Sequence, residues 1–295
     1  MALLFNREHK DRLFKVVFGA PENKDNALSL YNALNGTDYQ NSDDLIIYTI
    51  DNALYMGMHN DFSFILDGDI NLYEQQSTYN PNMPLRGLFY LSKQYEKYVE
   101  EHNIDIFSSK RKMIPTPRYV VFYNGGTKID ERMIMKLSDS FINKSSDNEA
   151  YAPSLEVNTL VINLNVDNNR DLLERCRPLM DYANFVNRVK MNIDNGMKIE
   201  SAIEEAVDYA IENDYLNGWF KIHRAEAIGM ILTEYDEKKH MQQIADEYKE
   251  LGRAEGIGKM SSLGQILLSE NKTAELSKAF ADSQYRDQLF KQYNI

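Results

Sequence analysis

The feature that most constrains the fold of this chain is a tight-turn signal, Asp67-Gly68, placed between two short apolar runs. The run before the turn reads DFSFIL, and the run after it reads INLYEQQ. Asp-Gly is favoured in two-residue type I′ turns, which need positive φ at both positions and join antiparallel strands. The segment therefore predicts a β-hairpin over residues 61–76, in which the numbers of facing residues sum to 135.

The predicted register places two acidic residues opposite each other. Asp61 faces Glu74, and opposed side chains on one sheet face have Cβ atoms about 5 Å apart, where like charges repel. A divalent cation between them removes the repulsion, because Mg²⁺ is bound by one or two carboxylates together with water and phosphate oxygens. Gln76 projects from the face of Glu74, whereas Gln75 points away and offers its backbone carbonyl. We therefore predict a Mg²⁺ site made by Asp61, Glu74 and the carbonyl of Gln75.

Such a site suits metal-assisted hydrolysis of a phosphodiester. The metal acidifies a bound water, orients the scissile phosphate and offsets the charge of the transition state. Gln76 is expected to position the water or a phosphate oxygen, since an amide cannot take up a proton. The alternative is an ordinary surface hairpin that carries Asp and Glu, and a bulged three-residue turn would shift the pairing by one register.

Composition limits the other kinds of site. The single cysteine excludes an internal disulfide framework and a thiolate metal cage, and five scattered histidines argue against zinc. The net charge of −12 argues against a surface coated with basic residues for non-specific nucleic-acid binding. The dense basic cluster is SSKRKMIPTPR, a loop-like stretch that contains Lys110, Arg111 and Lys112. These three residues are candidate contacts to a DNA backbone, and the alternative is a solvated loop.

The amino-terminal segment and the hydropathy pattern predict a cytoplasmic protein that does not enter a membrane. The first residues, MALLFNREHKDR, become charged at Arg7, which is too early for a signal peptide. No apolar run approaches the roughly 20 residues that a membrane-spanning helix needs.

The spacing of apolar residues divides the chain near residue 168. Before this point, helical periods alternate with short apolar runs of strand length. The expected helices span 7–20, 23–36 and 84–102, and the expected strands span 44–50, the hairpin, 118–125 and 159–166. After it, the period is 3.6 almost to the end. We therefore expect an α/β domain with a mixed central sheet over residues 1–168 and a mostly helical region over residues 169–295.

Five segments of the first 190 residues or so occur in an order that resembles a known family. They are DRLFKVVFG, ENKDNALSLYNALNG, NDFSFILDGDINLYEQQSTYNPNMPLRGLFYLSKQYEKY, YVVFYNGG and VINLNVDNNRDLLERCRPLMDYANFV. In sequence and order, they resemble the Rpn family of recombination-promoting nucleases, often labelled transposases, within the PD-(D/E)XK nuclease superfamily. The resemblance implies a restriction-endonuclease-like fold, a mixed central sheet flanked by helices. It also implies Mg²⁺-dependent DNA cleavage, with Mn²⁺ as a substitute, in recombination or mobile-element movement.

The resemblance assigns catalytic roles to residues of the hairpin. Asp61 matches the strand aspartate of the family motif, and Glu74 matches its second acid. Gln76 stands where the superfamily pattern has lysine, and this departure puts the water-activating role in doubt rather than the metal site.

Two further residues are candidates near the site. Asp11, in the amino-terminal D-x-x-F-K segment, is a candidate for an outer-shell contact, and its alternative is a helical i,i+4 pair with Lys15. Arg86 begins the helix after the hairpin. It could face a phosphate or hold a carboxylate in place, and the sequence leaves both open.

The leading function is a Mg²⁺-dependent DNA endonuclease. The alternative is a catalytically weak or silent DNA-binding or regulatory relative, which the net charge of −12 and the missing lysine at position 76 favour. A third hypothesis makes the helical second half an oligomerisation or partner surface. A homodimer would place two active sites against two DNA strands.

Overall fold

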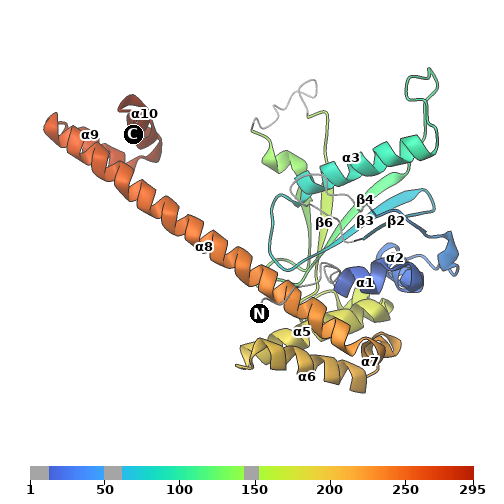
Figure 1. The fold of residues 1–295 in the computed structure, drawn as a ribbon. Helices are drawn as coiled ribbons and strands as arrows, with labels where there is room; N and C mark the ends of the chain where they lie inside the picture. Colours follow the sequence, from blue (N-terminus) through green and yellow to red (C-terminus); the bar gives the residue numbers. More distant parts are fainter. Residues whose placement is uncertain (1–12, 50–61, 143–152) are drawn as a thin grey trace, which may run out of the picture. The chain divides into compact units, whose positions relative to one another are not determined.

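The computed structural model describes residues 13–49, 62–142 and 153–295. Within these ranges the strands form a mixed six-stranded sheet in the order β1-β2-β3-β4-β6-β5 (Figure 1). The strands are β1 (Ile46–Ile47), β2 (Phe62–Leu66), β3 (Asp69–Gln76), β4 (Thr116–Tyr123), β5 (Arg132–Lys136) and β6 (Asn158–Asn163). β3, β4 and β6 run parallel, and the two outer pairs, β1 with β2 and β5 with β6, are antiparallel. The expected mixed sheet is confirmed.

β2 and β3 form the predicted hairpin. Asp67 and Gly68 have φ angles of 49° and 78°, both positive as a type I′ turn requires. The ladder pairs Phe62 with Tyr73 and Leu66 with Asp69, so the numbers of facing residues sum to 135. The turn chemistry therefore sets the predicted register along all of β2.

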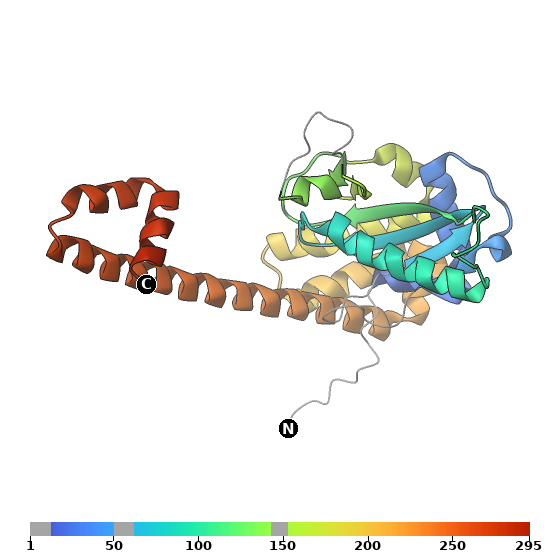
Figure 2. The same ribbon diagram turned by 90° about the horizontal axis from the view of Figure 1, so that it is seen from above.

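Helices cover both faces of the sheet (Figures 1 and 2). α3 (Met83–Glu101) lies on one face, whereas α1 (Leu13–Gly19), α2 (Lys24–Asn35) and α5 (Arg177–Asp194) lie on the other. The remaining α-helices of the described ranges are α4 (Arg170–Arg175), α6 (Ile199–Glu212), α7 (Trp219–Ile222), α8 (Arg224–Ser269), α9 (Thr273–Ala281) and α10 (Ser283–Gln292). α2 ends as predicted, because Gly36 adopts the left-handed conformation and its N–H bonds the carbonyl of Asn32.

The alternation of side chains along the strands gives the sheet a core on each face. On the side of α3, Leu72 of β3 packs with Tyr119 and Val121 of β4. On the other side, the ring of Phe14 lies 5.3 Å from that of Phe122 on β4 and 5.5 Å from that of Tyr182 on α5. The central strands are thus buried on both faces of the sheet, which explains their continuous apolar sequence.

Two strands differ from the sequence prediction. β5, with the sequence RMIMK, was not expected, since it is short, charged at both ends and lies at an edge of the sheet. The strand expected over residues 44–50 is reduced to the pair Ile46–Ile47, because a 3₁₀ turn over Ser42–Asp44 precedes it. Residue 50 lies outside the described ranges. An edge strand needs few backbone bonds, so local apolar patterning marks its ends poorly.

The chain divides into two compact units, Met1–Thr233 and Glu234–Ile295. Residue 168 marks a change to helical structure, and the first unit continues past it because α5 packs on α1 through Tyr182 and Phe14. In the second unit, the end of α8 packs with α9 and α10 around Leu263, Leu267, Ala279 and Leu289. Among the helices of the described ranges, none combines the length and apolar character needed to cross a membrane.

Gly87 sets how closely α3 approaches the sheet. A Cβ atom at this position would lie 2.4 Å from Cδ1 of Tyr119, far inside contact distance. Tyr119 is itself 4% exposed and packed in the core, so its ring has little room to move. The glycine is therefore required by packing, since it has no unusual φ.

We predict that Gly87→Ala destabilises the protein by about 1–2 kcal/mol, because the cost of overpacking exceeds the gain of up to about 1 kcal/mol in helix propensity. Gly229→Ala on α8 is the matched control, since a Cβ there meets nothing within 4 Å. It should be neutral or stabilising. Urea unfolding measures both variants, and equal effects of the two would contradict the packing role of Gly87.

Candidate active site

A buried carboxylate lies between β3 and α3. Glu74 is 1% exposed, and a buried charge must be compensated by partners. Its Oε1 accepts hydrogen bonds from the guanidinium of Arg86 and, at 2.8 Å, from the side-chain amide of Gln76. Its Oε2 accepts from the hydroxyl of Tyr119 at 2.7 Å. Three donors from the described residues thus fix both oxygens of the carboxylate.

Arg86 reaches Glu74 from the first turn of α3, and its side chain is 22% exposed. Burial alone would lower its pKa, but the carboxylate of Glu74 and a 3.0 Å hydrogen bond to Tyr90 outweigh burial, so the pKa of Arg86 is raised. Its Nε is buried and makes no hydrogen bond within the described part of the chain. Of the two roles that the sequence left open, the structure shows the carboxylate-holding one.

Tyr119 is the partner that the sequence did not indicate. It stands on β4 opposite Leu72, one pleat away from Glu74 and on the same face of the sheet. Burial, followed by the nearby carboxylate of Glu74, raises the pKa of Tyr119 well above its ordinary value. The hydroxyl therefore stays protonated and acts as a donor. Finding it would have required the parallel register of β3 and β4, which no local sequence signal fixes.

Gln75 and Asn124 lock together the carboxyl-terminal ends of β3 and β4. The side-chain amide of Gln75 donates to the Oδ1 of Asn124 at 2.9 Å, and the Asn124 N–H donates to the carbonyl of Gln76 at 3.1 Å. Because carbonyls alternate in direction along a strand, the Gln75 carbonyl points toward the β2 side of β3. At the neighbouring Gly125, a Cβ would lie 2.4 Å from the carbonyl oxygen of Ser77. The Asn-Gly pair thus serves the packing of the strand ends.

Two of the predicted site residues, Asp61 and Asp11, lie outside the described residues. The described residues therefore contain only part of the predicted Mg²⁺ ligand set. The carboxylate of Glu74 and the carbonyl of Gln75 are oxygen ligands of the kind that Mg²⁺ takes. No group of three acidic, histidine or cysteine side chains suited to a metal occurs in the described ranges. The third ligand that the sequence predicted, the carboxylate of Asp61, lies outside the described residues.

The basic cluster Lys110–Lys112 lies at the other end of the strands from Glu74. It precedes β4, whose first residue, Thr116, pairs with Asp69 at the start of β3. Glu74 is five residues further along β3, a separation of about 16 Å at the usual rise of a strand. The structure therefore brings Arg86 to the carboxylate but does not bring the basic cluster there.

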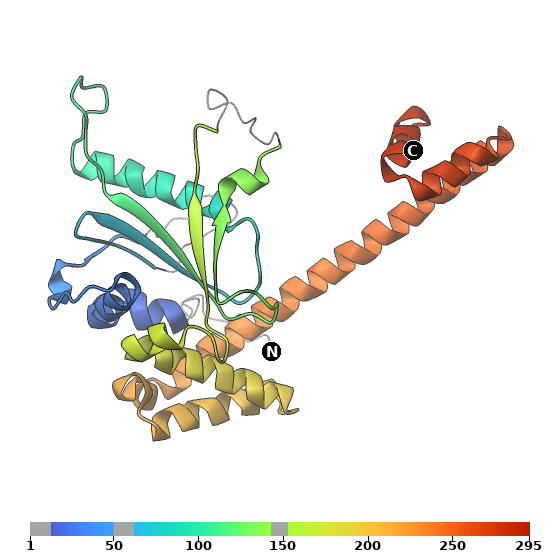
Figure 3. The same cartoon turned by 180° about the vertical axis from the view of Figure 1, so that it is seen from behind.

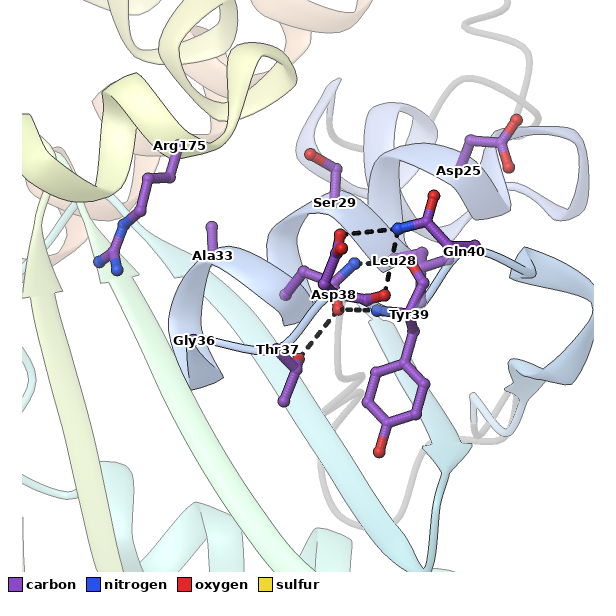
Figure 4. Close-up of a pocket in the computed structure, with 11 residues that line it drawn as sticks. Asp25, Leu28, Ser29, Ala33, Gly36, Thr37, Asp38, Tyr39, Gln40 and Arg175 are labelled. Atoms are coloured by element: carbon purple, nitrogen blue, oxygen red, sulfur yellow. Dashed lines mark hydrogen bonds between the residues drawn. The ribbon is translucent and has the colours of Figure 1, made fainter.

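A cavity of about 670 Å³ lies elsewhere, against α2 and the turn that follows it (Figure 4). Its polar groups are largely engaged with each other. The side-chain oxygen of Asn32 accepts from the hydroxyl of Thr37 at 2.9 Å and from the N–H of Tyr39 at 3.0 Å, and Gln40 donates to Asp38 at 2.7 Å. These bonds close the turn after α2, and none of the predicted site residues that the structure describes lines the cavity.

Comparison with known proteins adds no relative: no protein-family model, no curated protein and no solved structure matches the chain.

We predict that Arg86→Met destabilises the protein by about 3–5 kcal/mol, because it leaves the carboxylate of Glu74 buried without its cation. Adding Glu74→Gln should restore most of this loss, since the double variant buries no charge. Urea unfolding of the full double-mutant cycle measures the coupling. Lys93→Met, which removes an exposed pair with Glu96, is the control and should cost less than about 0.5 kcal/mol. Additive effects of the Arg86 and Glu74 variants would contradict this account.

Buried tyrosines predict a loss of stability in alkali. Burial raises the pKa of Tyr119 and Tyr73 well above the ordinary value, whereas the unfolded chain ionises near pH 10. Their contribution is therefore intact below about pH 10 and is lost as the pH rises above it. Above pH 10 the free energy of unfolding should fall less steeply with pH in Tyr119→Phe. The slope should be smaller by about 1.4 kcal/mol per pH unit, the value for one titrating proton. Urea unfolding from pH 8 to 11.5 measures this slope, and an unchanged slope in the variant would contradict the prediction.

Proposed function

We propose that the chain is a Mg²⁺-dependent DNA endonuclease of the PD-(D/E)XK type. The observation that carries the proposal is the buried carboxylate of Glu74, held by Arg86 and Tyr119 beside Gln76 on one face of β3. A fixed, desolvated acid at a strand end is a feature of metal and catalytic sites. The hairpin adds support, since the described ladder follows the register on which Asp61 was predicted to face Glu74.

The same proposal includes the finer features of the resemblance. They are a restriction-endonuclease-like fold, DNA as the substrate, a link to recombination or mobile elements, and action as a homodimer. The mixed sheet with helices on both faces supports the fold assignment without distinguishing it from other mixed α/β folds.

In this proposal each residue has a limited chemical role. A bound Mg²⁺ supplies the Lewis acid that acidifies water and offsets phosphate charge. Glu74 and the carbonyl of Gln75 would hold the ion. Arg86 and Tyr119 keep the carboxylate in one orientation, and Arg86 compensates its charge. The amide of Gln76 can orient a water or a phosphate oxygen but cannot accept its proton.

One observation favours the alternative of a silent DNA-binding or regulatory relative. The carboxylate of Glu74 already receives three donors from the described residues, including a cation that competes with a metal ion. If Arg86 stays on Glu74 when DNA binds, the site keeps its structure and does not load metal. Such a protein would bind DNA without cutting it.

Cleavage of supercoiled plasmid at low salt tests the proposal. We expect nicking or linearisation that requires Mg²⁺ or Mn²⁺ and falls at least 100-fold in Asp61→Ala and Glu74→Gln, because each removes a metal-binding charge. Glu74→Gln keeps the shape of the side chain, so its fold can be verified by thermal unfolding. Glu100→Ala, on an exposed position of α3, is the control and should cut normally.

Full activity in both site variants would refute the assignment of the site. Absence of cleavage with any divalent metal, from a folded protein that still binds DNA, would select the silent relative.

A further inference from the structure

The loop between α3 and β4, residues 104–115, exposes large apolar side chains beside the basic cluster. The exposed fractions are 65% for Ile106, 93% for Phe107, 81% for Met113 and 48% for Ile114. Lys110, Arg111 and Lys112 lie between these two apolar pairs and are exposed as well. Large apolar groups gathered on one surface mark an interaction site more often than scattered ones do. This loop therefore combines two features of a binding surface: exposed apolar area and a cluster of positive charges.

Hydrogen bonds anchor the loop at both ends. The Ile104 N–H donates to the carbonyl of Val99 at 2.9 Å, which ties the start of the loop to α3. The hydroxyl of Tyr95 donates to the carbonyl of Pro115 at 2.7 Å, which ties its end to the same helix. The loop thus leaves α3 and enters β4 at defined points, and it projects beyond the end where α3 stops and β4 begins (Figures 1 and 3).

Short-range bonds also shape the tip. The Phe107 N–H donates to the carboxylate of Asp105 at 3.0 Å, and the Lys110 N–H donates to the hydroxyl of Ser108 at 3.3 Å. These are the local turns that Asp and Ser side chains form with the backbone. Phe107 therefore stands out from a turned backbone instead of folding onto the neighbouring core.

We propose that loop 104–115 is a docking surface for duplex DNA. Lys110, Arg111 and Lys112 would contact phosphates, and Phe107 would insert at a base step in the minor groove. Charge complementarity supports a polyanion as the partner, since three consecutive cations stand out in a chain of net charge −12. Proteins that bend DNA through the minor groove use this pairing of cations with an apolar wedge.

The position of the loop favours DNA over another anionic partner, and this step rests on the proposed nuclease function. The start of β3 lies about 16 Å from Glu74 along the strand. Five base pairs of B-form DNA span about 17 Å. One duplex that follows β3 and β4 could therefore meet the loop while its scissile phosphate lies near Glu74. Because the loop projects beyond the start of β4, it would then hold and bend the substrate more than half a helical turn from the cut.

Binding of a labelled 20-base-pair duplex, measured by fluorescence anisotropy in EDTA, tests the loop without any cleavage. The variants are Lys110→Ala/Arg111→Ala/Lys112→Ala and, separately, Phe107→Ala. The triple variant should lower the slope of log affinity against log salt by about 2–3, since each lost phosphate contact contributes about 0.9. Phe107→Ala should weaken binding about fivefold or more at every salt concentration, because a lost aromatic contact does not depend on counterions.

A second triple variant is the matched control for charge. Lys198, Lys221 and Lys259 are exposed and scattered, and changing all three to alanine removes the same charge from the chain. Its salt slope should equal that of the unaltered protein. Thermal unfolding of each variant confirms that the fold is intact, which is expected because every changed side chain is exposed.

The outcomes separate this inference from the nuclease proposal. An unchanged salt slope in the loop variant, or no duplex binding by the unaltered protein, would overturn the inference even if plasmid is cleaved. A third outcome is that the unaltered protein binds vesicles containing phosphatidylserine but not the duplex, and that the loop variants lose this vesicle binding. This result would overturn the inference in favour of a lipid surface. If the loop is required for DNA binding but the protein does not cleave DNA, the docking surface is supported and only the nuclease proposal is refuted.

Discussion

The buried carboxylate of Glu74 is the constraint on which the rest of the first unit depends. Removing a charge from water is costly unless a partner of opposite charge and further hydrogen bonds replace the solvent. Arg86 from α3 and Tyr119 from β4 provide this compensation. The pairing needs α3 to lie close to the sheet, which Gly87 allows because Tyr119 occupies the space that a side chain would fill. The ion pair thus acts together with the apolar contacts of Met83, Tyr90 and Leu91 to hold α3 against the sheet.

The two faces of β3 differ in character: one carries aromatic packing, and the other carries the buried ion pair. On the face away from α3, aromatic residues of β2, β3 and β4 pack edge to face with each other, and Phe14 of α1 packs against Phe122 with its ring tilted. On the face toward α3, apolar packing surrounds the charged pair of Glu74 and Arg86. An apolar surround lowers the local dielectric, so it strengthens any interaction made by the carboxylate. The fold therefore holds one acid in a fixed orientation near the end of the central strand β3.

Sequence alone indicated the parts of this arrangement that local chemistry controls. The turn at Asp67 and Gly68 gave the hairpin register, and the glycine after α2 gave the end of that helix. The partners of Glu74 depend instead on how β4 aligns with β3 across a 39-residue connection, Ser77 to Pro115. No short pattern encodes that alignment, so Tyr119 was not expected. The edge strand β5 was missed because its five residues carry charges at both ends.

The proposed function depends on Glu74 helping to hold a divalent cation at the end of β3. Paramagnetic broadening by Mn²⁺ in the amide spectrum of the full-length protein tests this claim directly and detects even weak binding. We expect substoichiometric Mn²⁺ to broaden most strongly the signals of Glu74, Gln75 and Gln76 and of their nearest neighbours. Glu74→Gln should abolish this broadening while its spectrum remains that of a folded protein. The same broadening in Glu74→Gln, or broadening confined to other acidic surfaces, would contradict it.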